Sequence, residues 1–364
     1  MKITGITATP IRVPRAGTFT SSLGRSAYTE NAVVEIETDG DITGIGEICS
    51  IWDRKGRGQA EDINDLLAEV LVGRDPFRIA ETHAVMDALL HRSYPAKAGV
   101  DMALYDIVGK ALDTPVYNLL GGMVRDRVLL SHSLSMGEPE QVARQAADLV
   151  KKGYKTVKVK IGMDQRADLA TVEAVRKRIG DDIVLRVDAN MGWPTPKEAV
   201  RNIKALEPFH LELVEQPLHF SDLEGLRHVR EHVDTPIMAD ESVWVPGDAI
   251  ACIRAGAVDI FNVYLAEAGG IYPAAQIFAI AEAARLPCII GSMPELGIGT
   301  SAQAHLAFAM RNLGYGSDVN GVVYHADDII HETLRIEDGY ILPPPGPGLG
   351  VSLNPDKVEA YRIK

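Results

Sequence analysis

Three acidic residues stand at the ends of three successive apolar stretches of the chain: Asp188 in VDAN, Glu215 in VEQP and Asp240 in ADES. A single acid in such a place would more often be a helix cap or an ion-pair partner. Three carboxylates crowded together would repel one another unless a cation held them. Converging carboxylate oxygens suit a hard divalent cation, and Mg²⁺ takes few of them, leaving positions for water or substrate oxygens. The sequence therefore predicts a Mg²⁺ site, with Mn²⁺ as an alternative metal.

Two lysines precede these acids in the segment Lys158-Val159-Lys160. Because side chains alternate along a strand, both amines lie on one face, with Val157 and Val159 on the other. A second ammonium and a nearby divalent cation both disfavour the charged form of Lys160, so its pKa is expected below the ordinary value of about 10.4. A solvated charge pair on an edge strand is the alternative. We expect Lys160 to be the base that removes a proton next to a substrate carboxylate.

The elements that must position these residues are short apolar stretches alternating with longer amphipathic ones from about residue 128. Such alternation is typical of βαβ units and of a parallel sheet. Strands are expected at 128–133, 156–161, 183–188, 211–215, 236–240, 258–264 and 287–292. Seven strands at a nearly constant period favour a (β/α) barrel over a doubly wound sheet. The carboxyl ends of barrel strands carry active sites, and the acids and lysines fall there.

The first third of the chain reads as a separate α+β domain. Strands are expected at 3–13, 32–38 and 42–49, and helices at about 59–71, 77–91 and 96–111. Gly44 and Gly46 match the dinucleotide-binding GxGxxG only in part, since the third glycine and a following helix are missing. The proline-rich tail leaves the barrel period and is expected to return and cover the N-terminal sheet. The expected domains are 1–122, 123–324 and 325–364.

Composition narrows the class of protein. The 364 residues are 46% apolar and 24% charged, which is enough apolar material for a large core. A formal charge of −13 argues against a nucleic-acid partner, because phosphate binding needs clustered Lys and Arg. We find no apolar stretch near the roughly 18 residues of a membrane span. Three scattered cysteines indicate neither a disulfide framework nor a zinc site, and a cytoplasmic location fits best.

Together these motifs resemble the enolase superfamily, in the muconate lactonizing enzyme subgroup of the mandelate racemase/muconate lactonizing enzyme family. The resemblance spans nearly the whole chain: KVK, VDAN, EQP, ADES, the AGG and GSMPELGIGT motifs after the sixth and seventh barrel strands, and the GPGLG tail. It implies an α/β fold, a modified TIM barrel of the (β/α)7β type, with an N-terminal α+β capping domain completed by the C-terminal segment. It also implies a homo-oligomer, and one Mg²⁺ that holds a substrate carboxylate and stabilises an enediolate, the known pattern of this superfamily.

The resemblance also implies roles for particular residues. Lys160 would be the acid/base and Lys158 its electrostatic partner, and the three strand-ending acids would be the metal ligands. Glu295, in the GSMPELGIGT motif, would line the pocket near the enediolate or its leaving group. Asn190, in VDAN, is expected to contact the substrate.

The sequence departs from the family at the end of the sixth strand, where Tyr264 stands in place of a second lysine. No lysine lies between Lys204 and Lys357 to replace it. A neutral phenol with a pKa near 10 is a poor base, although it can donate a proton. We therefore expect one-faced chemistry from Lys160: a lyase or isomerase performing β-elimination or cycloisomerisation of a small carboxylic acid. The alternatives are a racemase or epimerase of an amino-acid derivative with Tyr264 as second acid and, more remotely, a non-catalytic binding protein.

The resemblance also implies that specificity comes from two cap loops, here 18–28 and 49–57. Arg25 in the first could pair with a second anionic group, and Trp52 in the second could stack on an apolar or cationic one. Asp318, where an eighth strand should end, resembles half of the paired-aspartate motif by which dipeptide epimerases of this subgroup hold an ammonium group, with Asn320 in place of the second acid. These features predict contacts without selecting one substrate.

Overall fold

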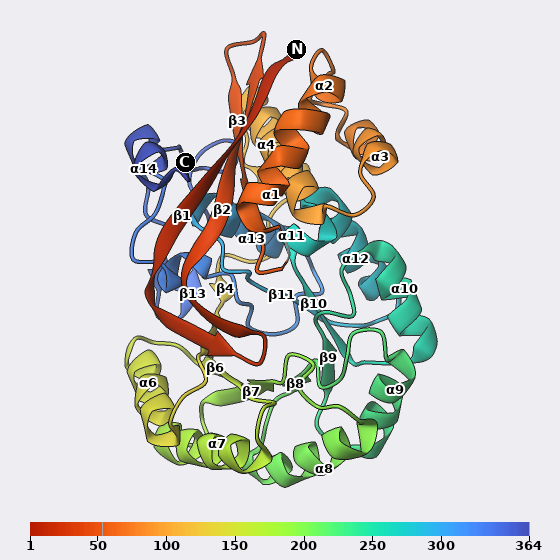
Figure 1. The fold of residues 1–364 in the computed structure, drawn as a ribbon, viewed down its shortest axis with the longest axis vertical. Helices are drawn as coiled ribbons and strands as arrows, with labels where there is room; N and C mark the ends of the chain where they lie inside the picture. The colour runs from red at the N-terminus through yellow and green to blue at the C-terminus, as the bar shows by residue number, and fades with distance from the viewer. Residues whose placement is uncertain (53, 364) are drawn as a thin grey trace.

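A computed structural model of the protein describes residues 1–52 and 54–363. Seven parallel strands form the main sheet in the order β11-β10-β9-β8-β7-β6-β5. Their bounds are Ser131–Leu134 (β5), Thr156–Lys160 (β6), Val184–Asp188 (β7), Val214–Glu215 (β8), Ile237–Ala239 (β9), Ile260–Val263 (β10) and Cys288–Ile290 (β11). Each expected barrel strand is present, and the first is split into β4 (Val128–Leu129) and β5. The modified TIM barrel with its N-terminal cap is confirmed (Figure 1).

Residues 313–318 take the place of the eighth strand and join the two edges of the parallel sheet. Leu313 bridges to Cys288 of β11, and Ser317 bridges to Leu130, between β4 and β5. The Ser131 amide donates to the Ser317 carbonyl at 2.9 Å. These bonds close the barrel, so the carboxyl ends of all its strands point to one mouth.

Helices surround the barrel on its outer side (Figure 1). They are α6 (Pro139–Lys151), α7 (Gln165–Ile179), α8 (Pro196–Leu206), α9 (Leu223–His232), α10 (Pro246–Ala255), α11 (Leu265–Ala268), α12 (Ile271–Ala283) and α13 (Gly297–Ala309), with 3₁₀ turns at Glu207–Phe209 and Gly321–Tyr324. Several begin on proline, whose fixed φ and missing N–H suit the first helical position. Among the described residues, no helix has both the length and the apolar character that crossing a bilayer requires.

The cap consists of an antiparallel sheet and a helical layer. Its elements are β1 (Ile3–Ser21), β2 (Gly24–Thr38), β3 (Thr43–Ile48), α1 (Lys55–Asp62), a π-helical turn (Ile63–Leu67), α2 (Ala68–Leu71), α3 (Ile79–Leu89), α4 (Tyr94–Ala111) and α5 (Val116–Leu119). Helix α4 packs directly on β3. A Cβ on Gly46 would lie 1.9 Å from the Gly99 carbonyl oxygen, and one on Gly44 would lie 2.2 Å from that of Ala103. The partial dinucleotide motif is thus a helix-on-sheet contact that only glycine permits.

The 18–28 segment, expected as a loop, is the end of a long β-hairpin. Strands β1 and β2 remain paired as far as Ser21 and Gly24. At the tip, the Ser22 hydroxyl lies 3.2 Å from the carbonyl oxygens of both Ala189 and Asn190, to which it donates. The hairpin therefore extends from the cap to the loop that follows β7 (Figure 1).

The tail returns to the cap, as expected. Strands β12 (Ile336–Glu337) and β13 (Tyr340–Ile341) pair beside β4, and α14 (Pro355–Tyr361) ends near β1, where Arg362 bridges to Ile11. The Leu349 amide donates to the buried Asp106 of α4 at 2.9 Å. The C-terminal segment thereby completes the cap.

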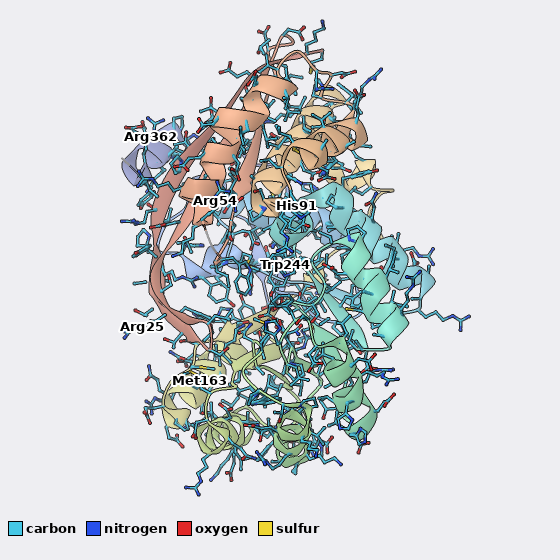
Figure 2. All side chains as sticks on the ribbon, turned by 45° about the vertical axis from the view of Figure 1, so that its right-hand side comes forward. Arg25, Arg54, His91, Met163, Trp244 and Arg362 are labelled. Atoms are coloured by element: carbon cyan, nitrogen blue, oxygen red, sulfur yellow. The ribbon has the colours of Figure 1, made fainter. Side chains whose placement is uncertain are left out.

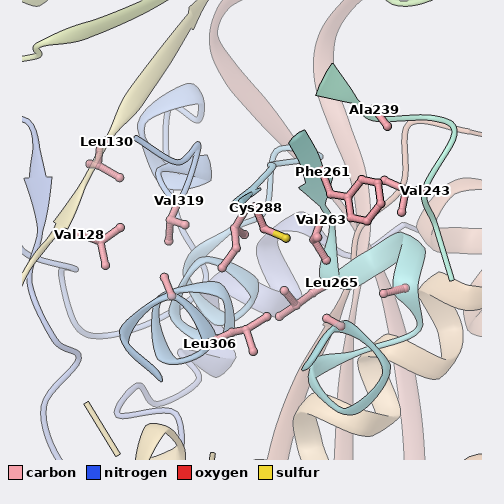
Figure 3. Packing of buried hydrophobic residues seen from close by; sticks show 14 of the residues in the cluster. Val128, Leu130, Ala239, Val243, Phe261, Val263, Leu265, Cys288, Leu306 and Val319 are labelled. Atoms are coloured by element: carbon pink, nitrogen blue, oxygen red, sulfur yellow. The ribbon is translucent and has the colours of Figure 1, made fainter. Parts of the chain in front are cut away.

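Apolar side chains fill both sides of the barrel wall. Phe261, Val263 and Cys288 point outward toward the helix layer, where Leu306 of α13 meets them (Figure 3). Inside, a separate buried cluster consists of Leu213, Met238, Ile260 and Ile289. Leu213 and Met238 precede Glu215 and Asp240 by two residues, so alternation puts this apolar layer directly beneath the acids.

Buried carboxylates of the cap bind the first turns of barrel helices. Glu47 of β3 accepts the amides of Leu296 and Gly299 at 2.8 Å each, at the start of α13. Asp101 of α4 accepts the amide of Ile271, the first residue of α12, at 2.5 Å. Free N–H groups and the helix dipole both favour an anion at a helix N-terminus. These bonds hold the cap over the barrel mouth.

The structure predicts acid sensitivity from the buried His305 of α13. Burial lowers the pKa of His305 to about 4, whereas an unfolded histidine titrates near 6.5. Below pH 6.5 the unfolded state takes up a proton that the folded state does not, so stability falls by about 1.4 kcal/mol per pH unit from this group. His305→Asn should lower stability at pH 7 but should lose about 2 kcal/mol less than wild type between pH 7 and pH 5.

Urea denaturation at the two pH values measures this difference. His331→Asn, a change at an exposed histidine, is the matched control and should follow wild type. Equal losses of stability in wild type and His305→Asn would contradict the assignment.

Candidate active site

The three predicted acids meet at the barrel mouth. Asp188 ends β7, Glu215 ends β8 and Asp240 follows β9, and each offers a carboxylate oxygen so that the three oxygens lie within 4.8 Å of one another. Burial raises the pKa of Glu215 and of Asp240 well above the ordinary range, and neighbouring carboxylates add to the shift. A divalent cation would relieve this repulsion, and an all-oxygen donor set is what Mg²⁺ prefers. The residues present therefore fit a Mg²⁺ ion.

Lys158 lies within this acidic cluster with only 2% of its surface exposed. Its Nζ donates to Asp318 at 2.6 Å and to Glu215 at 3.0 Å. Burial alone would lower the pKa of Lys158, but Asp318, Glu215 and Asp188 together raise it well above the ordinary value. Lys158 is consequently a fixed positive charge inside the barrel.

Lys160, at the end of β6, contacts Asp188 and donates to the Asn190 side-chain oxygen at 2.9 Å. Burial lowers its pKa most, and the Lys158 ammonium lowers it as well, as expected from the sequence. Asp188 and Glu215 outweigh them, so the pKa of Lys160 is raised above its usual value. The expected lowering included the charge of a bound divalent cation, so a lowered pKa of Lys160 stays a prediction for the metal-loaded site. A cation bound by Asp188 would compete with Lys160 for the same carboxylate.

Tyr264 follows β10, and its hydroxyl donates to Asp240 at 3.1 Å. Asn262 donates to the same hydroxyl oxygen at 3.3 Å. Burial raises the pKa of Tyr264 well above 10, and Asp240 and Glu215 raise it further, so the phenol is neutral. Its ring packs on Gly291, where a Cβ would lie 2.2 Å from the ring. Tyr264 is thus a proton donor whose present acceptor is a predicted metal ligand.

Lys160 and Tyr264 lie on opposite sides of the acids. In the sheet, β7, β8 and β9 stand between β6, which carries Lys160, and β10, which Tyr264 follows. Both side chains line one cavity of about 330 Å³, together with Lys158, Asn190 and Asp240. A small molecule in this cavity would meet an amine on one side and a phenol on the other.

The outer wall of the cavity comes from the cap. Phe19, Arg25 and Tyr28 of the hairpin line it, and so does Trp52. The Trp52 indole donates to Glu267 of α11 at 2.7 Å, and its ring lies 5.7 Å from that of Trp244. Figure 2 shows Arg25 near the hairpin tip and Trp244 at the junction of cap and barrel. Trp52 of the cap is therefore held by Glu267 of the barrel, which lies three positions after Tyr264.

Two predicted contacts have different partners in the structure. Glu295 lies behind the cavity wall instead of lining it, because its carboxylate accepts the Ser292 hydroxyl at 2.6 Å and the Met293 amide at 3.1 Å. Asp318 does line the cavity, but one of its oxygens is held by Lys158. Arg25 and Asn190 line the cavity, Arg25 from an exposed position, and their contacts with a substrate stay predictions.

Sequence reasoning missed two buried acids beside the cluster. Glu241 accepts the Asn190 amide at 3.1 Å, and burial, with the charge of Asp188, raises its pKa to about 8. Its signal was available, since it follows Asp240 in ADES. Glu267 is also buried, with its pKa raised well above the usual range by burial. No feature of the sequence marks Glu267, whose role depends on its contact with Trp52.

Comparison with known proteins agrees with this geometry. Residues 3–121 match the N-terminal domain of the mandelate racemase/muconate lactonizing enzyme family, and residues 141–357 match the enolase C-terminal domain-like family. The chain is 41% identical to a hydrophobic dipeptide epimerase of Enterococcus faecalis, over 86% of this chain and 89% of the relative. It is 33% identical to an N-succinyl-L-Arg/Lys racemase of Bacillus cereus (100% and 98%) and 32% identical to a chloromuconate cycloisomerase of Cupriavidus necator (99% and 99%).

Solved structures give the same result. The crystal structure of the Bacillus cereus N-succinyl Arg/Lys racemase superposes with a TM-score of 0.96, at 32% identity, over 100% of this chain and 99% of the other. That of the Enterococcus faecalis dipeptide epimerase, complexed with Mg and the dipeptide L-Leu-L-Tyr, has a TM-score of 0.91 at 37% identity, over 97% and 100%. The matches of both domains and the superposition of the whole fold show that the chain belongs to the mandelate racemase/muconate lactonizing enzyme family of the enolase superfamily.

Proposed function

We propose that this protein is a Mg²⁺-dependent racemase or epimerase of an amino-acid derivative, in which Lys160 and Tyr264 act on opposite faces of the α-carbon. The observation that carries the proposal is the pair of proton-bearing groups flanking the three acids in one cavity. Racemisation needs a proton removed on one face and delivered on the other. The dipeptide epimerase and N-succinyl amino-acid racemase relatives favour this reading over the lyase or cycloisomerase that the sequence first suggested.

Each residue would have a separate task. Asp188, Glu215 and Asp240 would hold Mg²⁺, and Mn²⁺ would suit the same oxygens. The bound metal would supply positive charge against the negative charge that develops on the substrate carboxylate. Lys160 would take the α-proton once its bond to Asp188 is loosened.

The other groups would complete the site. Tyr264 would deliver a proton from the opposite side, and its raised pKa makes the neutral phenol the resident form. Lys158 would stay charged and support the developing carboxylate charge. Asn190 would orient the Lys160 amine through its side-chain oxygen.

A one-faced lyase or cycloisomerase is the second candidate. It is favoured by the Tyr264 hydroxyl, which donates to Asp240 and has no free base form near neutral pH. In that reaction Lys160 alone would remove the proton, and Tyr264 would only assist a leaving group or line the wall. The chloromuconate cycloisomerase relative is consistent with it.

Metal binding gives the first test. Mg²⁺ should raise the thermal stability of wild type, because a ligand at about one hundred times its dissociation constant adds about 2.7 kcal/mol. Asp240→Asn should lose most of this Mg²⁺-dependent gain while keeping its stability without metal, since one repelling charge is gone. Calorimetric titration and thermal unfolding with and without Mg²⁺ measure both effects.

The control is Asp113→Asn, an exposed cap residue whose positive φ of 48° asparagine tolerates. It should keep the full response to Mg²⁺. A full response in Asp240→Asn as well would mean that the acids are not the metal site.

Isotope exchange separates the two candidate reactions. For an amino-acid derivative in D₂O, a two-faced enzyme should place deuterium in the product before it appears in recovered substrate. Lys160→Ala should abolish α-proton exchange. Tyr264→Phe should slow racemisation by about 10²- to 10⁴-fold, the usual contribution of a general acid, while Lys160 still exchanges the proton with retention.

Tyr340→Phe, which removes a hydroxyl from the small β12-β13-β4 sheet, should behave as wild type. If Tyr264→Phe racemises the substrate at the wild-type rate, the tyrosine only lines the cavity and transfers no proton. Release of an unsaturated or cyclised product would favour the one-faced candidate.

A further inference from the structure

We propose that Arg15 binds a second carboxylate of the substrate at the cap side of the cavity, so that the preferred substrates are amino-acid derivatives with two carboxylates. The inference rests on the proposed function, because the first carboxylate is the one that the metal site would hold. It assigns a specificity-determining role to a residue of β1 outside the expected specificity loops.

Arg15 lies in the wall of the same cavity as Lys160 and Tyr264. Its backbone bridges to His325 in the returning tail, so the strand is fixed at this point. The guanidinium carbon is 5.4 Å from the centroid of the Phe19 ring, another wall residue. A half-buried position against an aromatic face limits the directions in which its donors can point.

The Arg15 charge lacks a counter-ion among the residues that the structure describes. Arg12, three residues earlier on the same strand, pairs with Glu30 at 2.6 Å, whereas Arg15 forms no such ion pair there. The buried Nε of Arg15 also has no hydrogen-bond partner in that part of the chain. Burial lowers the pKa of Arg15, and the groups that oppose this effect are Cys49 and Tyr324 rather than carboxylates. A desolvated cation with an unused donor is costly, and an anionic ligand would remove the cost.

The charges around Arg15 point to the same chemistry. Arg25 and Lys55 line the outer wall as well, and the acid of this region, Glu30, is neutralised by Arg12. In a protein with a formal charge of −13, this wall is locally positive. A guanidinium presents two parallel donors in a plane, which matches a planar carboxylate in a bidentate bond. The cavity thus has two anion-binding ends, the metal site and Arg15.

The second carboxylate could be carried by an N-acyl group or by a side chain, and matched substrates distinguish these sources. One pair is N-succinyl-L-leucine and its terminal carboxamide, and the other is L-Ala-L-Glu and L-Ala-L-Gln. Within each pair only the charge changes. For all four compounds, kcat/KM comes from α-proton exchange followed by NMR in D₂O, and Kd comes from calorimetry with Mg²⁺ present.

Wild type should prefer the carboxylate member of one pair by about tenfold or more in both Kd and kcat/KM, as expected for a charge-assisted bond in a half-buried site. Arg15→Met should reduce the preference to about twofold or less and leave the carboxamide member almost unchanged. Arg15→Lys keeps the charge but not the two coplanar donors, so it should retain part of the preference for the carboxylate. The same variant replaces Arg15→Met in the test if Arg15→Met folds poorly. Arg78→Met removes the same charge from an exposed ion pair of the cap and should keep the full preference.

The outcomes separate this inference from the proposed function. If wild type shows no preference in either pair, or if the preference survives Arg15→Met, the role of Arg15 is refuted even when α-proton exchange proceeds. If Kd shows an Arg15-dependent preference but no compound exchanges its α-proton, the anion site stands and the racemase proposal fails.

Discussion

Mutual repulsion among buried carboxylates is the constraint on which this active site depends. Asp188, Glu215 and Asp240 converge on one point, above an apolar layer that excludes water. Burial raises the pKa values of Glu215 and Asp240, and the neighbouring carboxylates raise them further. Lys158 offsets part of the negative charge from within the barrel. The negative charge that remains would be neutralised by a divalent cation. The fold therefore favours binding of positive charge at the place where substrate carboxylates would bind.

Much of this arrangement could be predicted because strand geometry is regular. Alternation put Lys158 and Lys160 on one face, and a constant βα period put the three acids at neighbouring strand ends. The same regularity put Tyr264 at a strand end, and the family resemblance implied that this position lies across the metal site from Lys160. Where a side chain's position follows from the backbone alone, the sequence motif was sufficient to predict that position.

Other features depended on particular side-chain and backbone contacts, some local and some between distant segments, which the sequence does not display. Glu295 turns away from the cavity because donors from its own loop bind it. Asp318 lines the cavity, but one of its oxygens is held by Lys158, which is 160 residues away in the sequence. Burial and Lys158 lower the pKa of Lys160, whereas Asp188 and Glu215 raise it. The direction of the net shift depends on the distances between these groups, which the sequence does not give. The 18–28 segment was expected as a loop from the family resemblance, whereas backbone pairing makes it the end of a β-hairpin.

The bonds from the cap to the barrel have a consequence for how the chain folds. Glu47 is made early in synthesis, yet the amides that it binds belong to Leu296 and Gly299, about 250 residues later. Asp106 likewise accepts the amide of Leu349, which is made more than 200 residues later. The cap can form its sheet and helices first, and Asn31, Ile45 and Lys110 already satisfy part of these carboxylates, but the amides of Leu296, Gly299 and Leu349 reach them only after most of the barrel has been made. Such a high contact order predicts slow, late docking, with the cap as the part of the nascent chain most dependent on protection.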